Sequence, residues 1–210
     1  MTTDGGLEGD HVIGVVGGDA RLAEAAMAQP GASVRFVPDS TSDIARALGL
    51  TAGAGLRAPV SLDVLMVDTI GAAVNMVVLG TAPDRRRAVF RSRKCRVEVD
   101  GRVVWDNGAT GVVVANGEYL RGLDVVPRGH PGDGRLEVHV YAMGSAQAKQ
   151  MRARLATGTH LPHPGIHTTQ GSSVTVRWDR PVRCEVDGVR GGRARTARVA
   201  LAPGALTLVP

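Results

Sequence analysis

The stretch GVVGGDARLAEAA at residues 14–26 runs from an apolar segment through two glycines into a segment with helical spacing. It predicts a strand, a tight turn and a helix. A second pair follows: a strand at residues 32–38, and a helix at residues 40–50 that starts in a Ser/Thr/Asp cluster. Because strands that alternate with helices form parallel sheets, residues 11–50 predict a small α/β unit.

The pattern changes after a Gly/Pro/Ala-rich stretch at residues 51–60, which is typical of a linker. β-branched segments then dominate, and the Asp-Gly pair at 100–101 indicates a hairpin. One helix is predicted at residues 145–158. The predicted strands are 61–68, 72–80, 94–104, 110–120, 136–144, 172–178, 182–189, 197–202 and 205–210.

The predicted fold class is therefore α/β plus all-β, with the all-β part a sandwich or curled sheets. The predicted domains are a disordered lead-in at residues 1–10, a reduced α/β nucleotide domain at 11–55, and a β-rich domain at 56–210 whose last strands occupy 199–209.

Composition excludes several classes of function. Aromatic residues make up only 3% of the chain, so we expect no base-stacking surface and no nucleic-acid partner. Cys95 and Cys184 are far apart and lack metal-ligand spacing, which predicts two reduced thiols in a cytosolic protein. Residues 1–10 lack the apolar core of a secretory signal, and no apolar run reaches the ~18 residues that span a bilayer. We expect a soluble, cytoplasmic protein.

The run DRRRAVFRSRKCR at residues 84–96 contains six arginines and one lysine. Two interpretations are open: peripheral contact with anionic lipid headgroups, or a solvated loop.

Three histidines, His160, His163 and His167, have the three- and four-residue spacing of metal ligands on a helix. Pro162 and Pro164 exclude a helix there. We therefore expect ordinary structural histidines rather than a metal site.

Several segments form an ordered series of landmarks. They are VVGGDARLAEAA (15–26), FVPDSTSDIARALGL (36–50), Asn75 with Gly80, VVANGEYLRGLDVVPRGHPGDGRLEVHVY (113–141), the segment 158–188 and PGALTLVP (203–210). In this order the chain resembles the diacylglycerol and sphingosine kinase family of lipid kinases over residues 12–210. The resemblance implies an NAD kinase-like fold and transfer of the ATP γ-phosphoryl group to a lipid hydroxyl, with Mg²⁺. Family members also have a longer N-terminal part, so we expect half of the nucleotide cleft to be missing or supplied by another chain.

The resemblance implies a nucleotide-binding site made of Gly17, Gly18, Asp19, Arg21 and Thr41. The family's GGDGT turn is altered here, because Ala20 and Arg21 replace its second Gly-Thr pair; Arg21 offers a charge to a phosphate instead. The alternative is structural: a strand–helix turn with a capping aspartate, followed by a capping cluster of Ser40, Thr41 and Asp43.

The family's catalytic base and metal ligands are altered as well. The position of its base is Val189, which cannot accept a proton, so Asp187 is the candidate substitute; the alternative is an Asp-Gly hairpin turn. Asp133 and Glu137 match part of its Mg²⁺ segment, and the alternative there is a turn between two strands.

These departures predict a degenerate homologue, non-catalytic or weakly active, that binds a lipid or nucleotide ligand or a partner. One alternative is an active ATP-dependent lipid kinase with Arg21 on the phosphate and Asp187 as the base. Another is a module that self-associates through its β-domain into a homo-oligomer.

Overall fold

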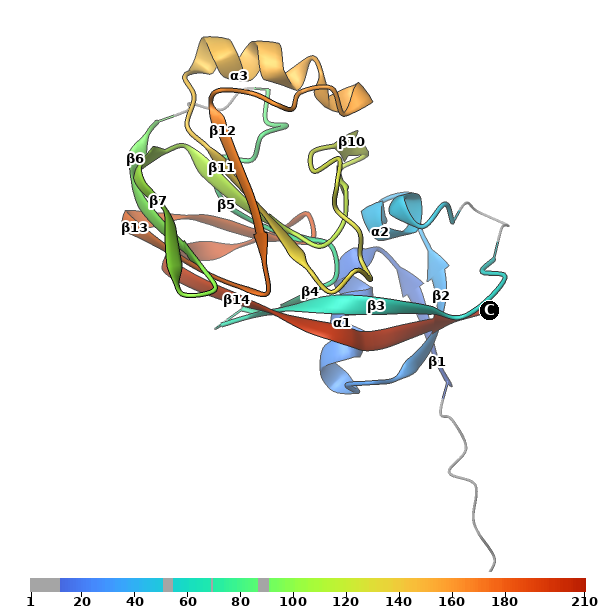
Figure 1. The fold of residues 1–210 in the computed structure, drawn as a ribbon. Coiled ribbons are helices and arrows are strands. Elements are labelled where there is room, and N and C mark those ends of the chain that lie inside the picture. The colour runs from blue at the N-terminus through green and yellow to red at the C-terminus, as the bar shows by residue number, and fades with distance from the viewer. Residues whose placement is uncertain (1–11, 51–54, 69, 87–90) are drawn as a thin grey trace, which may run out of the picture.

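The structure is a computed structural model that describes residues 12–50, 55–68, 70–86 and 91–210. The predicted lead-in at 1–10 lies outside the described residues. The chain begins with β1 (Val12–Gly17), α1 (Asp19–Ala28), β2 (Ser33–Pro38) and α2 (Asp43–Ala47). β1 and β2 pair in parallel, which confirms the predicted strand–helix–strand–helix unit (Figure 1).

The remaining elements are mostly strands, as predicted. They are β3 (Val60–Val67), β4 (Gly71–Ala73), β5 (Met76–Gly80), β6 (Arg93–Val99), β7 (Arg102–Ala109), β8 (Gly111–Ala115), β9 (Tyr119–Leu120), β10 (Leu123–Asp124), β11 (Leu136–Tyr141), α3 (Ser145–Arg152), η1 (Leu155–Thr157), β12 (Ile166–Gly171), β13 (Ser173–Val186) and β14 (Val189–Val209).

One sheet connects both parts of the chain. Its main path is β1-β2-β14-β13-β5-β8-β11-β12. Off this path, β3 pairs with β14 and with β4, and β6 pairs with β13 and with β7. β14 runs through both parts: it pairs antiparallel with β13 and β3, and its residues 207–209 pair in parallel with residues 33–35 of β2. Figure 1 shows this long strand ending beside β2.

The prediction of two separate strands at 197–202 and 205–210 was wrong, because Pro203 and Gly204 form a bulge instead of a break. The register against β3 shifts between Ala202 and Leu206. Gly204 takes a φ of 60°, and its N–H donates to the Asp63 carboxylate at 2.8 Å. The strand therefore continues into the sheet of the α/β unit.

The predicted strand at 72–80 is interrupted in the structure. The Asp187 carboxylate accepts the N–H groups of Val74, Asn75 and Met76, so these residues turn toward it between β4 and β5. The predicted strand at 110–120 ends at Ala115, where the N–H of Asn116 donates to the Asn75 carbonyl.

Three more parts of the secondary structure differ from the prediction. β12, at residues 166–171, was not predicted because its sequence IHTTQG is polar. The segment 172–178 joins residues 182–186 in β13 across a register shift between Arg177 and Val182, where Pro181 is tolerated. The rest of the predicted strand 182–189 is the turn at 187–188 and the first residue of β14. The helix predicted at 145–158 ends at Arg152 and continues as a short 3₁₀ turn that Gly158 closes with a φ of 63°.

Three groups of buried apolar side chains form the core. The first lies inside the β-sandwich and includes Val77 and Leu79 of β5. The alternate residues Met76 and Val78 face the other way, into a second group that α3 and η1 cover. The third lies between the two N-terminal helices and the sheet that β1, β2, β14 and β3 form.

Both cysteines are free, as predicted, and the structure also shows that both are buried. Burial raises the pKa of Cys95 to about 12 and that of Cys184 to about 11, so both thiols are protonated at neutral pH. Of the helices in the described ranges, none is both long and apolar enough to traverse a membrane.

Candidate functional site

The GGD turn, residues 17–19, lies where β1 ends beside β2. Gly17 has a φ of 134° and lies opposite Pro38 in the sheet. Gly18 is packed against the β2–α2 turn, because a Cβ added to it would lie 2.8 Å from Thr41 Oγ1. The structure therefore brings Gly17, Gly18 and Thr41 together at the carboxyl edge of a parallel sheet, the usual place for ligands in α/β folds.

Asp19 faces the protein interior rather than this edge. It is only 5% exposed, and its carboxylate accepts the Ser42 hydroxyl at 2.6 Å and the N–H groups of Asp43 and Ile44 at 3.1 and 3.2 Å. Burial raises the pKa of Asp19 to about 6, although the Ser42 hydrogen bond opposes the shift. Asp19 thus stabilises the first turn of α2.

The other polar groups at the turn also have protein partners. The Thr41 hydroxyl donates to the Asp39 carboxylate at 2.6 Å, and Arg21 forms an exposed ion pair with Glu24 at 2.8 Å. The bonds from Thr41 lower the pKa of Asp39. Asp39 is therefore ionised at neutral pH and would repel a phosphate.

The residue that caps α2 is not one of the three predicted for the capping cluster. Ser42 is the N-cap of α2, and its Oγ accepts the Ala45 N–H at 3.0 Å. Thr41 instead closes its own turn through Asp39. Asp43 lies in the first helical turn, where it accepts the N–H groups of Arg121 and Gly122.

Asp187 occupies the Asp-Gly turn of the β13–β14 hairpin with a φ of 47°. Its two carboxylate oxygens accept three backbone N–H groups, from Val74, Asn75 and Met76, at 2.9–3.0 Å. Burial, together with the charge of Asp19, raises the pKa of Asp187 to about 7, although the three N–H bonds oppose the shift.

Val189, which the resemblance matches to the position of the family's base, is 57% exposed and lies opposite Val186 in the hairpin. It lines a cavity of about 600 Å³ between α1 and the hairpin. Apolar side chains such as Ala23 and Met27 form much of its wall. Val189 therefore gives this cavity no proton acceptor.

The two residues predicted as metal ligands have separate partners. Asp133 is exposed and accepts the Arg135 N–H at 3.0 Å. Glu137 is buried in β11 and accepts the amide of Gln170. Asp63, which the sequence analysis did not select, accepts the Gly134 N–H at 2.8 Å and holds this turn. Among the described residues, no group of three His, Cys, Asp or Glu side chains has the arrangement of a metal site.

The three histidines also have different neighbours. His160 is buried, with its Nε2 3.1 Å from the Val125 carbonyl oxygen. His163 Nδ1 accepts the N–H of Gly165 at 2.9 Å. His167 lies beside the Trp105 ring. Each has a role in the local structure.

Sequence reasoning missed a cluster of four charged side chains. Arg121 donates to both oxygens of Asp84 at 2.7 and 2.8 Å and to Glu185, which also accepts from Arg85 at 3.0 Å. Since the backbone of Arg121 also donates to Asp43 of α2, this loop connects the α/β unit to the β-domain. Nothing in the local sequence distinguishes Arg121 from other surface arginines.

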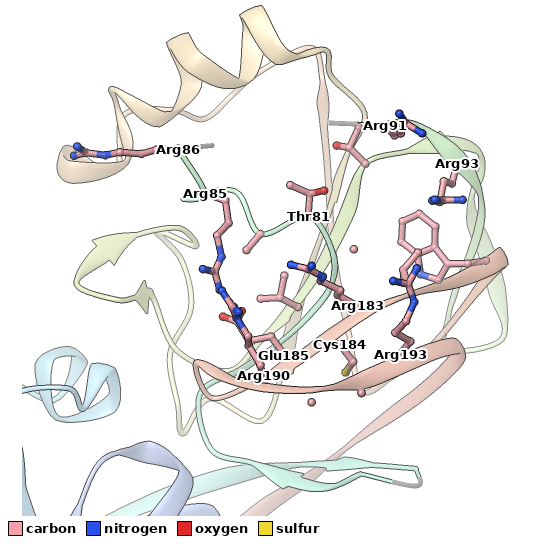
Figure 2. Close-up of a pocket in the computed structure, with 18 residues that line it drawn as sticks. Thr81, Arg85, Arg86, Arg91, Arg93, Arg183, Cys184, Glu185, Arg190 and Arg193 are labelled. Carbon is pink, nitrogen blue, oxygen red and sulfur yellow. The ribbon is translucent and has the colours of Figure 1, made fainter. Parts of the chain in front are cut away.

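A second cavity, of about 930 Å³, lies in the β-domain, and we name it the arginine cavity. Its arginines come from two sides (Figure 2). One side has Arg85, Arg86, Arg91 and Arg93, and the β13–β14 hairpin contributes Arg183, Arg190 and Arg193. Four of the seven basic residues in the run 84–96 therefore border the cavity.

Solved structures give the fold relationship. A diacylglycerol kinase from Bacillus anthracis str. Sterne is similar with a TM-score of 0.77 and 19% identity, over 94% of this chain and 75% of that one. An NAD kinase from Archaeoglobus fulgidus, solved with ATP, has a TM-score of 0.51 and 10% identity, over 95% of this chain and 77% of that one. These identities establish the fold alone.

Sequence comparison gives the family. No curated protein matches the chain. A family model, described as the YegS C-terminal NAD kinase beta sandwich-like domain, matches residues 58–210. This range contains β3–β14, the part in which the landmarks Asn75, Gly80 and residues 113–141 lie. The expected NAD kinase-like fold is thus confirmed, and the chain belongs to the family of the YegS C-terminal NAD kinase beta sandwich-like domain.

Proposed function

We propose that the chain is a non-catalytic member of the diacylglycerol kinase-like proteins that binds a ligand instead of transferring a phosphoryl group. One observation supports this most strongly: the base position is Val189, and the neighbouring Asp187 already accepts three backbone N–H groups. A general base needs a lone pair within reach of the substrate hydroxyl. Asp187 would have to break these bonds to supply one.

The partners of Asp19, Thr41 and Arg21 at the GGD turn also support this proposal, because each side chain already interacts with the protein. ATP with Mg²⁺ is the first ligand to test there. Gly17 and Gly18 lie at the sheet edge without side chains of their own, and glycine turns bind phosphates through their backbone N–H groups.

A second candidate is an active lipid kinase with Asp187 as its base. The pKa of about 7 for Asp187 favours this candidate, because a base with a pKa near the working pH is the most effective. In this mechanism Arg21 would leave Glu24 and contact the transferred phosphate.

Transfer of ³²P from ATP to vesicles that contain diacylglycerol distinguishes the two candidates. The proposal expects no transfer above the protein-free blank by the wild type or by Asp187→Asn. Transfer by the wild type that Asp187→Asn reduces by 10²-fold or more, the usual effect of losing a general base, would establish the active kinase instead.

Binding is tested separately, by thermal unfolding with Mg²⁺-ATP. A ligand at 100 times its Kd adds about 2.7 kcal/mol, which raises the Tm of a protein of this size by roughly 5–10 °C. Arg21→Gln should reduce the shift if the GGD turn holds the phosphates. The matched control is Arg198→Gln, which removes an exposed arginine that is paired with Asp68 in the same way. Equal shifts in both variants would place ATP elsewhere.

A further inference from the structure

We propose that the arginine cavity is a binding site for a small molecule with at least two phosphoryl groups. This site lies in the β-domain and is separate from the GGD turn, since neither Gly18 nor Thr41 lines it. The inference therefore stands whether or not the chain transfers phosphoryl groups.

The first argument is charge. Seven arginines and one glutamate line the cavity, a formal charge of +6 among its described lining residues. The glutamate, Glu185, is already bonded to Arg85 and to Arg121. Arg190 lies opposite Glu185 in the β13–β14 ladder, so the hairpin arginines without a facing carboxylate are Arg183 and Arg193. The excess positive charge attracts an anion with more than one charge.

The second argument is the pairing of Arg183 and Arg193. These residues lie directly opposite each other in the β13–β14 ladder, where like charges destabilise a sheet. Arg193 donates to the Pro181 carbonyl at 2.8 Å, whereas the Arg183 side chain has no hydrogen-bond partner among the residues that the structure describes. Figure 2 shows the Arg183 guanidinium within the cavity.

Outside the cavity, arginines that lie opposite each other in the sheet do have a carboxylate partner. Arg177 of β13 and Arg96 of β6 both donate to Glu98, each at 2.9 Å. There the sheet stabilises its cations with a carboxylate. The lack of such a carboxylate between Arg183 and Arg193 is explained if a bound anion takes its place.

The third argument is a buried donor in the same wall. Trp178 lines the cavity and is 3% exposed, yet its indole nitrogen has no hydrogen-bond partner among the described residues. An indole N–H only donates, so a phosphoryl oxygen would satisfy it if the bound ligand reached this wall. A buried donor without a partner is otherwise costly.

The size of the cavity fits a small phosphorylated compound. Its volume of about 930 Å³ is near the upper end for ligand sites. Arginine forks bind phosphoryl oxygens in pairs. In Figure 2 Arg85 on one side and Arg183 and Arg193 of the hairpin extend into the cavity, whereas Arg86 extends away from them. A single phosphoryl group neutralises only a small part of the +6 charge, which is why we assign at least two.

Calorimetric titration of the full chain with pyrophosphate, without Mg²⁺, tests the proposal. We expect saturable binding that weakens as salt increases. Arg183→Gln and Arg193→Gln should each raise the Kd at least about 10-fold, the usual effect of losing a hydrogen bond to a charged group. The matched control is Arg180→Gln, an exposed arginine of β13 that does not line the cavity, and it should change the Kd less than 2-fold. Absence of binding at 10 mM pyrophosphate, or an equal loss in Arg180→Gln, would overturn the proposal.

Two further measurements separate binding from folding and from the GGD turn. Without ligand, Arg183→Gln should keep or raise the Tm, because it removes a repulsion; a lower Tm would mean that Arg183 is structural. Since Arg21 does not line the cavity, a loss of pyrophosphate binding in Arg21→Gln without a loss in Arg183→Gln would move the site to the GGD turn.

The phosphoryl groups could belong to a lipid headgroup or to a free metabolite. Sedimentation with phosphatidylcholine vesicles, with and without diacylglycerol pyrophosphate, whose headgroup carries two phosphoryl groups, distinguishes these sources. Binding to the diacylglycerol pyrophosphate vesicles that pyrophosphate displaces and Arg183→Gln abolishes assigns the headgroup. Pyrophosphate binding without vesicle binding assigns a free compound.

Discussion

Replacing Asp19 by alanine tests whether the aspartate of the GGD turn is structural. The change removes the acceptor for the Ser42 hydroxyl and for the N–H groups of Asp43 and Ile44, all in a buried site. Each buried donor that loses its partner costs about 1–3 kcal/mol, and Ser42 still accepts from Ala45. We therefore expect a net loss of about 2–4 kcal/mol at pH 5, or a Tm lower by roughly 5–15 °C.

The pH dependence of this loss has a definite sign. Burial raises the pKa of Asp19 from 3.8 to about 6, so protonation favours the folded state. This stability is fully present below pH 3.8 and is lost as the pH rises through 6. The cost of Asp19→Ala should therefore be about 1.4 kcal/mol greater at pH 5 than at pH 8.

Urea denaturation at both pH values, followed by circular dichroism, measures these costs. Asp39→Ala is the matched control, because Asp39 also accepts hydrogen bonds at this turn but is exposed. If the two variants cost the same and neither cost changes with pH, Asp19 does not support α2 and its carboxylate is free to act at the turn.

Three other substitutions test the packing around the site by the same denaturation assay. Gly80→Ala should cost at least about 2 kcal/mol, since its φ is 90° and a Cβ would lie 2.8 Å from the Thr110 carbonyl oxygen; a cost below 0.5 kcal/mol would contradict this. Arg121→Met should cost about 1–3 kcal/mol, because it leaves Glu185, whose side chain is 9% exposed, without one of its partners. The 33% exposure of Arg121 reduces this cost, and an unchanged urea midpoint would show that the ion pair does not stabilise the fold. Leu208→Ala should cost about 2–5 kcal/mol, since this side chain is fully buried beside the α/β unit; a cost typical of a surface residue would mean that β14 is not fixed there.

Structural features that depend on local patterns could be predicted from the sequence. The Asp-Gly pair at 100–101 forms the predicted hairpin, with φ values of 47° and 76° and Val99 opposite Arg102. The βα units were visible because their periodicity changes between strand and helix. Gly158 ends the third helical region as predicted.

Features that depend on distant residues could not be predicted. Asp187 interrupts a strand more than 100 residues away, and no local pattern at residues 72–80 signals this interaction. The arginines of residues 85–93 and of the hairpin are separate in sequence, so the cavity between them was not predicted. The turn residues around Asp19 matched a phosphate loop, yet their hydrogen-bond partners are decided by tertiary contacts.

The contact between β2 and β14 also joins a strand made early in synthesis to one made 175 residues later. The Arg35 side chain donates to the carbonyl of Pro210, 175 residues further along the chain. Closing a loop of that length costs about 4–5 kcal/mol of entropy, apart from a constant. During synthesis, β2 therefore keeps an unpaired edge until β14 has been made, and such edges promote aggregation. The α/β unit comes first in the sequence but completes its sheet among the last steps of folding.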